Sequence, residues 1–432
     1  MCPVADFGCK AQRAGFRARD GQTPGTRIRL RGVLVTGLAL GTSLVTSTLI
    51  PSELRGAASE SEQGANLSSD STQCIVPVTE RHRFGSVDGP DALSRVANVF
   101  LNRAGRDPTI FVLLPQEREL RAFSAGGEPV LHIGEGGSGP GEFEAPASAG
   151  LLDDELWVWD AAFGRLSFFG EDGTYRRSLA LAAGERAFPL SDGTVVRRPR
   201  IVDPTRATEV VLERLRGEDG AVLDTLAVLR YEAATIRVGS GDFSYTTANP
   251  FSDHPLTVAA SDGRGFAVVH RRLEESGQAS ILRVRIWGVD ASTVTVHVPM
   301  DPVPFSTEDV DSVLSHLSET YLRGAMRAGV PVNRRDVAPA ALRESILVPR
   351  WRPAVRGVIL APDGDIWLET VGRGNEEGVT WMVVRPGDDR ICHAELPAGW
   401  SLRDVNGPVG VAVARGPMDI PQILVLEVSR RR

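Results

Sequence analysis

Three short segments of this sequence place polar or aromatic side chains just before a proline. They are Phe143-Glu144 before Pro146, Asp253-His254 before Pro255, and Trp351-Arg352 before Pro353. Carboxylate, imidazole, indole and guanidinium groups suit the binding of a polar small molecule or a peptide, because a few convergent polar groups on an apolar wall orient a ligand. The candidate ligand-binding residues are therefore Glu144, Asp253, His254, Trp351 and Arg352.

No catalytic or metal-binding motif accompanies these residues. None of the seven histidines has a His-Glu-x-x-His or comparable spacing, and the sequence has no Gly-x-Ser-x-Gly elbow and no calcium loop. Gly134-x-Gly136-x-x-Gly139 formally matches a dinucleotide fingerprint, but Pro140 follows where that fingerprint needs a helix. The sequence thus predicts no catalytic residues, no metal ligands and no cofactor, although a divalent metal held between several repeats stays open.

The composition excludes several reaction classes and disfavours one class of partner. Lys10 is the only lysine, so the rest of the chain has no amine for a Schiff base, a phosphate-binding loop or a lysine general base. The net charge is −7, although the first 31 residues hold seven basic side chains against two acidic ones. The remainder is therefore more acidic than the whole chain, which disfavours nucleic-acid binding.

An apolar segment near the N-terminus predicts export. Residues 32–50 carry no charge, three arginines precede them, and small residues follow at 56–58. This order is typical of a secretory signal peptide cleaved near Ala58. A retained signal anchor is the alternative, because the run approaches the length that crosses a bilayer, and a buried core helix is a third reading. We expect residues 1–58 to be a basic N-terminus plus signal peptide or anchor, and 59–73 to be a disordered linker.

Two cysteines, Cys74 and Cys392, lie in the part that would be exported. In an oxidising compartment they could form a disulfide. Two cysteines so far apart in sequence could equally be separate buried thiols. The sequence leaves both possibilities open.

Six copies of one apolar sequence pattern recur between residue 74 and the C-terminus. Each copy has a short apolar strand, a turn, a second strand with an aromatic or β-branched centre, and a polar strand. The second-strand centres are Phe111, Trp157, Val195, Phe266, Trp367 and Val411. Spacings of 46, 38 and 44 residues fit four-stranded propeller blades, and the spacings of 71 and 101 each fit a blade plus an insertion. The sequence predicts an all-β, six-bladed β-propeller over residues 74–432.

The ends of the repeat array predict how the ring closes. The last copy, which ends near Val428, is too short for four strands, and the strand-like segment 75–84 precedes the first copy. We expect this segment to supply the missing outer strand, because closure removes exposed sheet edges. Asp-Gly pairs beginning at 172, 192, 219, 262 and 363 predict hairpin turns in which both central residues have positive φ.

Residues 301–348 differ from the repeats and predict helices. Ser306 or Thr307 can cap a helix, and apolar residues recur at helical spacing from Val310 to Met326. A second, short helix is expected over 336–345. We expect this helical insertion, around 305–345, to pack on the outside or rim of the propeller; a lid or a partner-docking element is the alternative.

Several segments of the repeat region resemble the NHL-related bacterial six-bladed β-propellers. The similar segments are the glycine-rich stretch from Ile133 to Phe143, Leu156-Trp-Val-Trp-Asp160, Arg165-Leu-Ser-Phe-Phe169, Asp172-Gly173, and Trp351 to Glu369. The similarity covers about residue 81 to the C-terminus. Many members of that family have no assigned activity, so the resemblance implies a fold without a reaction.

Together these observations favour a non-catalytic, ligand- or protein-binding scaffold of the cell envelope, in the periplasm or at the cell surface. We expect a monomer that binds an envelope protein, a polar small molecule or a peptide, and that meets the membrane only through residues 32–50. The alternative is a metal-dependent exported hydrolase or lyase with its site at the mouth of the propeller channel, using Glu144 and His254. A third reading leaves the candidate residues as ordinary loop residues around a water-filled channel.

Overall fold

The computed structural model describes most of the chain from Cys74 onward. The described residues are 74–102, 108–182, 185–199, 208–231, 235–240, 243–276, 279–290, 292–372 and 378–429. The predicted signal peptide or anchor and the linker lie outside these residues and remain predictions. Among the described residues, no helix combines the length and the apolar character needed to cross a bilayer.

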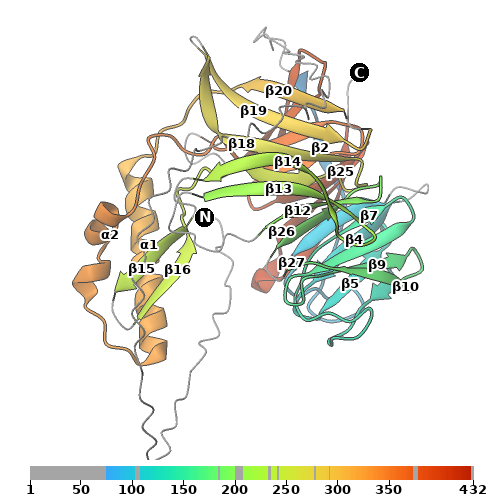
Figure 1. Cartoon of the computed structure of the whole chain (residues 1–432), viewed down its shortest axis with the longest axis horizontal. Coiled ribbons are helices and arrows are strands. Elements are labelled where there is room, and N and C mark those ends of the chain that lie inside the picture. Colours follow the sequence, from blue (N-terminus) through green and yellow to red (C-terminus); the bar gives the residue numbers. More distant parts are fainter. Residues whose placement is uncertain are drawn as a thin grey trace, which may run out of the picture. The chain divides into compact units, whose positions relative to one another are not determined.

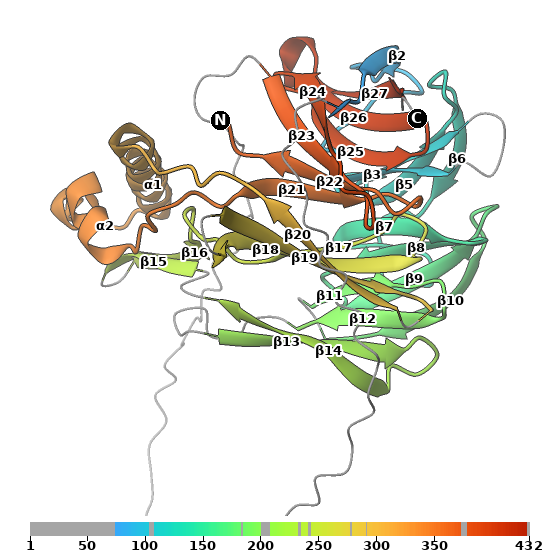
Figure 2. The same cartoon turned by 90° about the horizontal axis from the view of Figure 1, so that it is seen from above.

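Six small sheets make up the body, and each is one blade of a six-bladed β-propeller (Figures 1 and 2). Blade 1 contains β3 (Asn98–Asn102), β4 (Thr109–Leu114), β5 (Glu119–Phe123) and β6 (Pro129–Ile133). Blade 2 contains β7 (Pro146–Leu152), β8 (Glu155–Asp160), β9 (Arg165–Gly170) and β10 (Tyr175–Ala180). Blade 3 contains β11 (Arg186–Pro189), β12 (Thr194–Arg198), β13 (Thr208–Arg216) and β14 (Val222–Tyr231). Blade 4 contains β17 (Leu256–Ala259), β18 (Gly265–Ser276), β19 (Ala279–Gly288) and β20 (Thr293–Pro299). Blade 5 contains β21 (Val355–Leu360), β22 (Ile366–Thr370), β23 (Gly378–Val384) and β24 (Ile391–Pro397). Blade 6 contains β25 (Ser401–Asn406), β26 (Val409–Arg415), β27 (Pro421–Val428) and β2 (Val78–Phe84).

The predicted repeat centres all lie in the second strand of a blade. Phe111 is in β4, Trp157 in β8, Val195 in β12, Phe266 in β18, Trp367 in β22 and Val411 in β26. Each of these side chains is buried. The prediction of an all-β, six-bladed propeller is therefore confirmed.

The hydrophobic core follows the ring. Six clusters of buried apolar side chains each join two neighbouring blades: 1 with 2, 2 with 3, 3 with 4, 4 with 5, 5 with 6, and 6 with 1. A sheet buries its apolar residues only against another layer, so each blade is stabilised by its neighbours on both sides. The cluster between blades 6 and 1 completes the ring.

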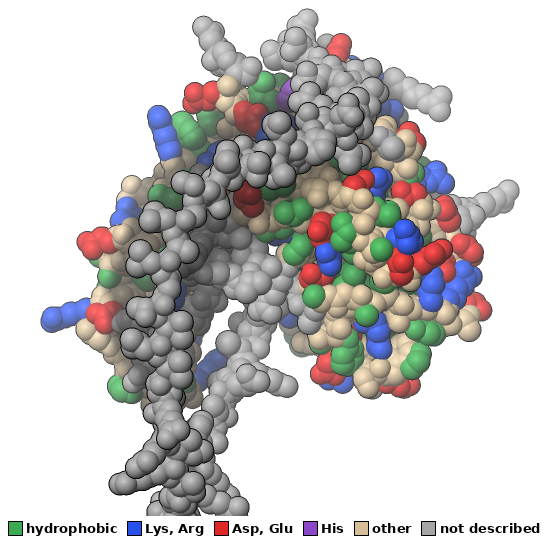
Figure 3. Space-filling view, viewed as in Figure 1, with side chains coloured by type: hydrophobic (Ala, Val, Ile, Leu, Met, Phe, Trp, Pro, Cys, Tyr) green, Lys and Arg blue, Asp and Glu red, His purple; other side chains and the backbone are tan. Residues whose placement is uncertain are grey.

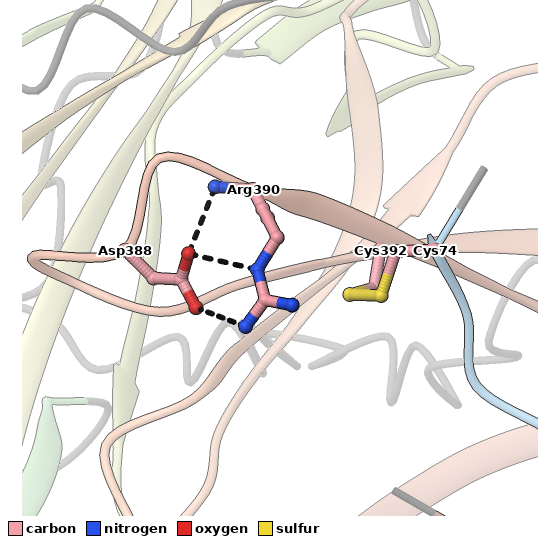
Figure 4. Close-up of a disulfide and its surroundings, with 4 residues drawn as sticks. All are labelled: Cys74, Asp388, Arg390 and Cys392. Atoms are coloured by element: carbon pink, nitrogen blue, oxygen red, sulfur yellow. Dashed lines mark hydrogen bonds and ion pairs between the residues drawn. A yellow bond between two sulfur atoms is a disulfide. The ribbon is translucent and has the colours of Figure 1, made fainter. Parts of the chain in front are cut away.

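The strand expected to close the ring does so. β2 pairs antiparallel with β27 and is the outer strand of blade 6, as predicted from residues 75–84. Just before it, β1 (Cys74–Ile75) pairs in parallel with β24 at the edge of blade 5. Cys74 and Cys392, which face each other in this pairing, form a disulfide (Figure 4). The N-terminal segment of the body is thus fastened to two blades, and the question that the sequence left open is answered in favour of the disulfide.

The Asp-Gly turns were predicted in the right places but with the wrong geometry. Gly173, Gly193 and the other three glycines of these pairs have positive φ, whereas none of the five aspartates does. The aspartate carboxylates instead accept a hydrogen bond from the backbone N–H two residues ahead, as Asp172 does from Thr174 at 3.0 Å. An aspartate that stabilises its own turn in this way does not need the left-handed conformation.

The glycine-rich stretch after Ile133 is a connection between blades 1 and 2. Its last residue, Phe143, is fully buried in the core between these blades. Gly134 has a φ of +90°, and a side chain there would collide with the Phe143 ring. The glycines therefore admit a buried aromatic ring, in agreement with the rejection of a dinucleotide fingerprint.

The two insertions form one module. The helices α1 (Thr307–Ala328) and α2 (Pro339–Ser345), with a 3₁₀ turn at Arg334–Val337 between them, come from one insertion, and the hairpin β15 (Thr235–Ser240) and β16 (Phe243–Ala248) comes from the other. Figures 1 and 2 show α1 and α2 beside this hairpin. The buried residues that they share are Ile236, Val238, Phe251, Val310, Leu314, Tyr321, Val337, Leu342 and Ile346.

The start of α1 agrees with the predicted capping signal. Ser306 and Asp309 form a capping box at the start of α1, and Gly329 ends the helix in the left-handed conformation. Val310, Leu314 and Tyr321 are buried, whereas Met326 at the end of the predicted apolar stripe is 67% exposed. No blade strand contributes to the buried core of this module among the residues that the structure describes. The helical insertion therefore packs on the β15–β16 hairpin, a partner that the sequence did not indicate.

Candidate ligand-binding site on the top face

The three proline-marked segments lead into the first strand of a blade, as predicted. Pro146 begins β7, Pro255 directly precedes β17, and Pro353 lies two residues before β21. We call the face that carries these leading loops the top face. On the side of the molecule seen in Figure 3, acidic and basic side chains are interspersed over the described residues.

One arginine organises the loop that contains His254. Arg271, in β18, donates hydrogen bonds from Nε to the carbonyl oxygen of His254 at 2.7 Å and from a terminal nitrogen to that of Ser252 at 2.8 Å. Its own backbone carbonyl accepts a hydrogen bond from the N–H of Ala354 at 3.0 Å. Arg271 therefore links the leading loop of blade 4 to that of blade 5.

His254 is a neutral imidazole among guanidinium groups. Burial lowers its pKa to about 4, and the charges of Arg271, Arg198 and Arg186 act in the same direction, while Asp253 opposes them. The Nδ1 atom lies 3.1 Å from the Ser252 hydroxyl oxygen. Arg186 begins β11 and Arg198 ends β12, so blade 3 contributes positive charge next to the blade 4 loop.

Asp253 lines a cavity on the top face. The cavity has a volume of about 300 Å³, and its walls are formed by Arg230, Asp253, Pro255, His270, Arg271, Arg272, Leu273 and Glu274. Asp253 pairs with Arg272 at 2.6 Å. We call this space the top-face cavity. Its volume lies at the lower end of the range that small-ligand pockets occupy.

Trp351 and Arg352 fasten the insertion module to blade 5. The Arg352 N–H donates to the carbonyl oxygen of Val303 at 2.8 Å, and its guanidinium pairs with Asp309 in the first turn of α1. Trp351 forms a β-bridge with Pro304 and is 36% exposed. The Arg352 side chain thus has a structural contact, whereas part of the Trp351 indole is accessible.

Glu144 lies in a different part of the molecule from the other candidates. Its carboxylate pairs with Arg118 of the β4–β5 turn at 3.3 Å, and its N–H donates to the Asp160 carboxylate at 2.7 Å. No contact described in this structure connects it to Asp253, His254, Trp351 or Arg352. The structure therefore places Asp253 and His254 in the loop held by Arg271, Trp351 and Arg352 at the base of the insertion module, and Glu144 with blades 1 and 2.

The arginines of this region were missed by the sequence analysis. Arg230, Arg271 and Arg272 lie in β14 and β18, where no proline or glycine marks them. The one available signal was the Arg271-Arg272 pair directly after an apolar strand core. Within the described residues, no group of three or more His, Cys, Asp or Glu side chains is arranged to hold a metal ion.

The comparisons with known proteins add only remote similarities. No protein-family model and no curated protein matches this sequence, so the resemblance to the NHL-related propellers stays a prediction. A "Putative exported protein" from Bacteroides fragilis is 12% identical, covers 85% of this chain and 98% of its own, and has a TM-score of 0.43. A member of the DUF4221 family from Bacteroides vulgatus is 10% identical, with 83% and 100% covered and a TM-score of 0.45.

The name of a third solved structure describes it as a calcium-binding protein. The calcium-binding protein regucalcin from Agrobacterium tumefaciens is 14% identical, with 83% of this chain and 97% of its own covered, and has a TM-score of 0.37. At such identities and TM-scores, neither a ligand nor an activity follows for this chain.

Proposed function

We propose that this chain is an exported, non-catalytic β-propeller that acts as a binding scaffold of the cell envelope and takes an acidic peptide segment of a partner protein on its top face. The observation that carries the proposal is the basic character of the top-face cavity and of the loop beside it. Arg230, Arg271 and Arg272 line the cavity with two carboxylates, Asp253 and Glu274, and Glu209 pairs with Arg230 from outside the lining. Arg186 and Arg198 add positive charge next to His254.

This local excess contrasts with the chain as a whole, whose net charge is −7. A basic patch attracts an acidic segment, whereas the net negative charge of the whole chain repels further copies of the protein. The neutral His254 imidazole, beside Arg271, can supply hydrogen bonding, and the accessible part of Trp351 in the leading loop of blade 5 can supply apolar contact. A peptide could use all three kinds of contact along its length.

Export is supported by two independent observations. The basic flank and apolar run at residues 27–50 are typical of a signal peptide or anchor. The disulfide between Cys74 and Cys392 is a bond that forms and persists in oxidising compartments such as the periplasm. N-terminal sequencing of the mature protein would distinguish a cleaved signal from a retained anchor.

Binding is tested with fluorescently labelled polyglutamate and polylysine peptides and the purified chain, by fluorescence anisotropy. We expect the polyglutamate peptide to bind and the polylysine peptide not to bind, with an affinity that falls as salt is raised. R272Q should weaken binding roughly threefold or more, because a charged hydrogen-bonding group is lost.

R177Q is the matched control, because Arg177 also pairs with a carboxylate, that of Glu155, on blade 2. This variant should bind as the wild type does. Equal affinity for the two peptides, or binding that R272Q leaves unchanged, would contradict the proposal.

A further inference from the structure

A second cavity lies between blades 3 and 4. It has a volume of about 330 Å³ and is lined by Ala227, Val228 and Leu229 of β14, Val268 and His270 of β18, Arg283, Arg285 and Trp287 of β19, and Thr293, Thr295 and His297 of β20. We call it the inter-blade cavity. It shares His270 with the top-face cavity, and its other lining residues are different.

The polar residues of this cavity are in register across three strands. The cross-strand sets are His270, Arg283 and His297; Val268, Arg285 and Thr295; and Phe266, Trp287 and Thr293. Residues directly opposite on neighbouring strands have Cβ atoms only about 5 Å apart. Two guanidinium groups, two imidazoles and two hydroxyls therefore gather on one face of the sheet, with Trp287 at one end.

The fold itself does not require polar residues at these positions. The alternate residues of the same strands face blade 5, and Val269, Leu282, Val284, Val296 and Val298 are buried there in an apolar core. A propeller can pack both faces of a blade in that manner. Positions at which a sequence departs from what its fold needs are typical of functional sites.

The charge of the cavity favours an anion. Arg283 pairs with Glu274 at 2.9 Å, and the Arg285 guanidinium lies over the Trp287 ring at 5.1 Å from its centroid. Burial lowers the pKa of His270, as do the charges of Arg283 and Arg285, while Glu274 opposes them. The described residues that line the cavity thus include two permanent positive charges and no carboxylate, so a second cation would be repelled.

The walls also offer an apolar surface. Ala227 and Leu229 of β14 line the blade 3 side, while Val268 and Trp287 lie next to Arg285 on blade 4. An arginine side chain binds carboxylate and phosphate oxygens with two parallel hydrogen bonds, whereas an aromatic wall binds a planar apolar group.

We propose that the inter-blade cavity binds a small organic oxyanion, a carboxylate or a phosphate ester with a planar or apolar body. The oxyanion lies against Arg283 and Arg285 and accepts a hydrogen bond from the Thr295 hydroxyl, while the body lies against Trp287. This site does not depend on the top-face peptide site of the proposed function, because only His270 borders both cavities.

Isothermal titration calorimetry of the purified full chain tests the proposal with three probes: phenyl phosphate, benzoate and inorganic phosphate. We expect one of the two organic anions to bind saturably and at least roughly tenfold more tightly than inorganic phosphate, because the apolar body adds contact area. Which of the two binds distinguishes a phosphate ester from a carboxylate.

Two variants locate the binding. R285Q should weaken binding of the organic anion roughly tenfold or more, since a charge-assisted hydrogen bond is lost. T295V, which keeps the shape of the side chain but removes its hydroxyl, should weaken this binding a few-fold. R177Q is the control, because Arg177 likewise lies over an aromatic ring, that of Phe168, at 3.6 Å from its centroid and lines neither cavity.

Thermal unfolding of each variant shows whether it is folded. Absence of saturable binding by both organic anions, equal affinity for inorganic phosphate, or unchanged affinity in both R285Q and T295V would overturn the proposal. Loss of polyglutamate binding in R272Q with phenyl phosphate or benzoate binding retained would show that the two sites are separate.

Discussion

The two faces of blade 4 are built from the same strands but have opposite characters. Toward blade 5, Leu282 and Val284 of β19 pack in a closed apolar core. Toward blade 3, the intervening Arg283 and Arg285 line a cavity. Neighbouring residues of one strand thus alternate between holding the ring together and facing a solvent-accessible space. The comparison teaches that part of one blade face can line a cavity while the rest of that face, here Phe266 and Val268 of β18, still packs in an apolar cluster with the neighbouring blade.

The largest effect is expected on the apolar face. L282A should lower the free energy of unfolding by about 3 kcal/mol, because it leaves a cavity in a fully buried cluster between blades 4 and 5. Urea unfolding followed by circular dichroism measures this loss. A loss below about 1 kcal/mol, well under the range of about 2 to 5 kcal/mol for such a truncation, would contradict the comparison, because the cluster toward blade 5 would then add little to stability.

A pH-dependent effect is expected from the leading loop of blade 4. The folded-state pKa of His254 is about 4, below its ordinary value of 6.5. For a base with a lowered pKa, the neutral form stabilises the fold above the unfolded pKa, and this contribution is lost as the pH falls toward 4. The free energy of unfolding of the wild type should therefore fall by up to about 3 kcal/mol between pH 6.5 and pH 4 because of this histidine.

H254Q should not show this part of the loss, because glutamine has no titrating group. Urea unfolding of both proteins at several pH values measures the difference. If the two curves ran parallel, the guanidinium groups of Arg186, Arg198 and Arg271 would not be acting on this histidine, and the basic character of the top face would be in question.

The smallest effect is expected on the cavity face. R285L should change the free energy of unfolding by less than about 1 kcal/mol, because a polar group at the edge of an apolar cluster is replaced by an apolar one. The same variant should lose organic-anion binding in calorimetry. A strong destabilisation would contradict this expectation and show that Arg285 stabilises the contact between blades 3 and 4.

The fold could be predicted from the sequence because its signals are local and repeated. An aromatic or β-branched centre such as Trp157 or Trp367, with a turn before it and a polar strand after it, recurs at blade-length spacing. The closing strand followed from the incomplete last copy. The start of α1 followed from the Ser306 cap.

The candidate site could be predicted only in part because its residues are brought together by register and packing. A proline marks the loop of His254, but nothing local indicates that Arg271 clamps this loop to blade 5. The association of α1 with the β15–β16 hairpin also joins two insertions that a whole blade separates in the sequence. The inter-blade cavity depends on how β18, β19 and β20 align, which composition does not reveal.

The pairing of β2 with β27 has a consequence for how the protein is made. The first long strand of the body pairs with the last one, so the ring cannot close until β27 has been synthesised. Contacts between such distant segments form slowly and leave apolar edges exposed in the meantime. A truncation that removed β27 would leave β2 without its partner strand in blade 6 and the ring open between blades 6 and 1.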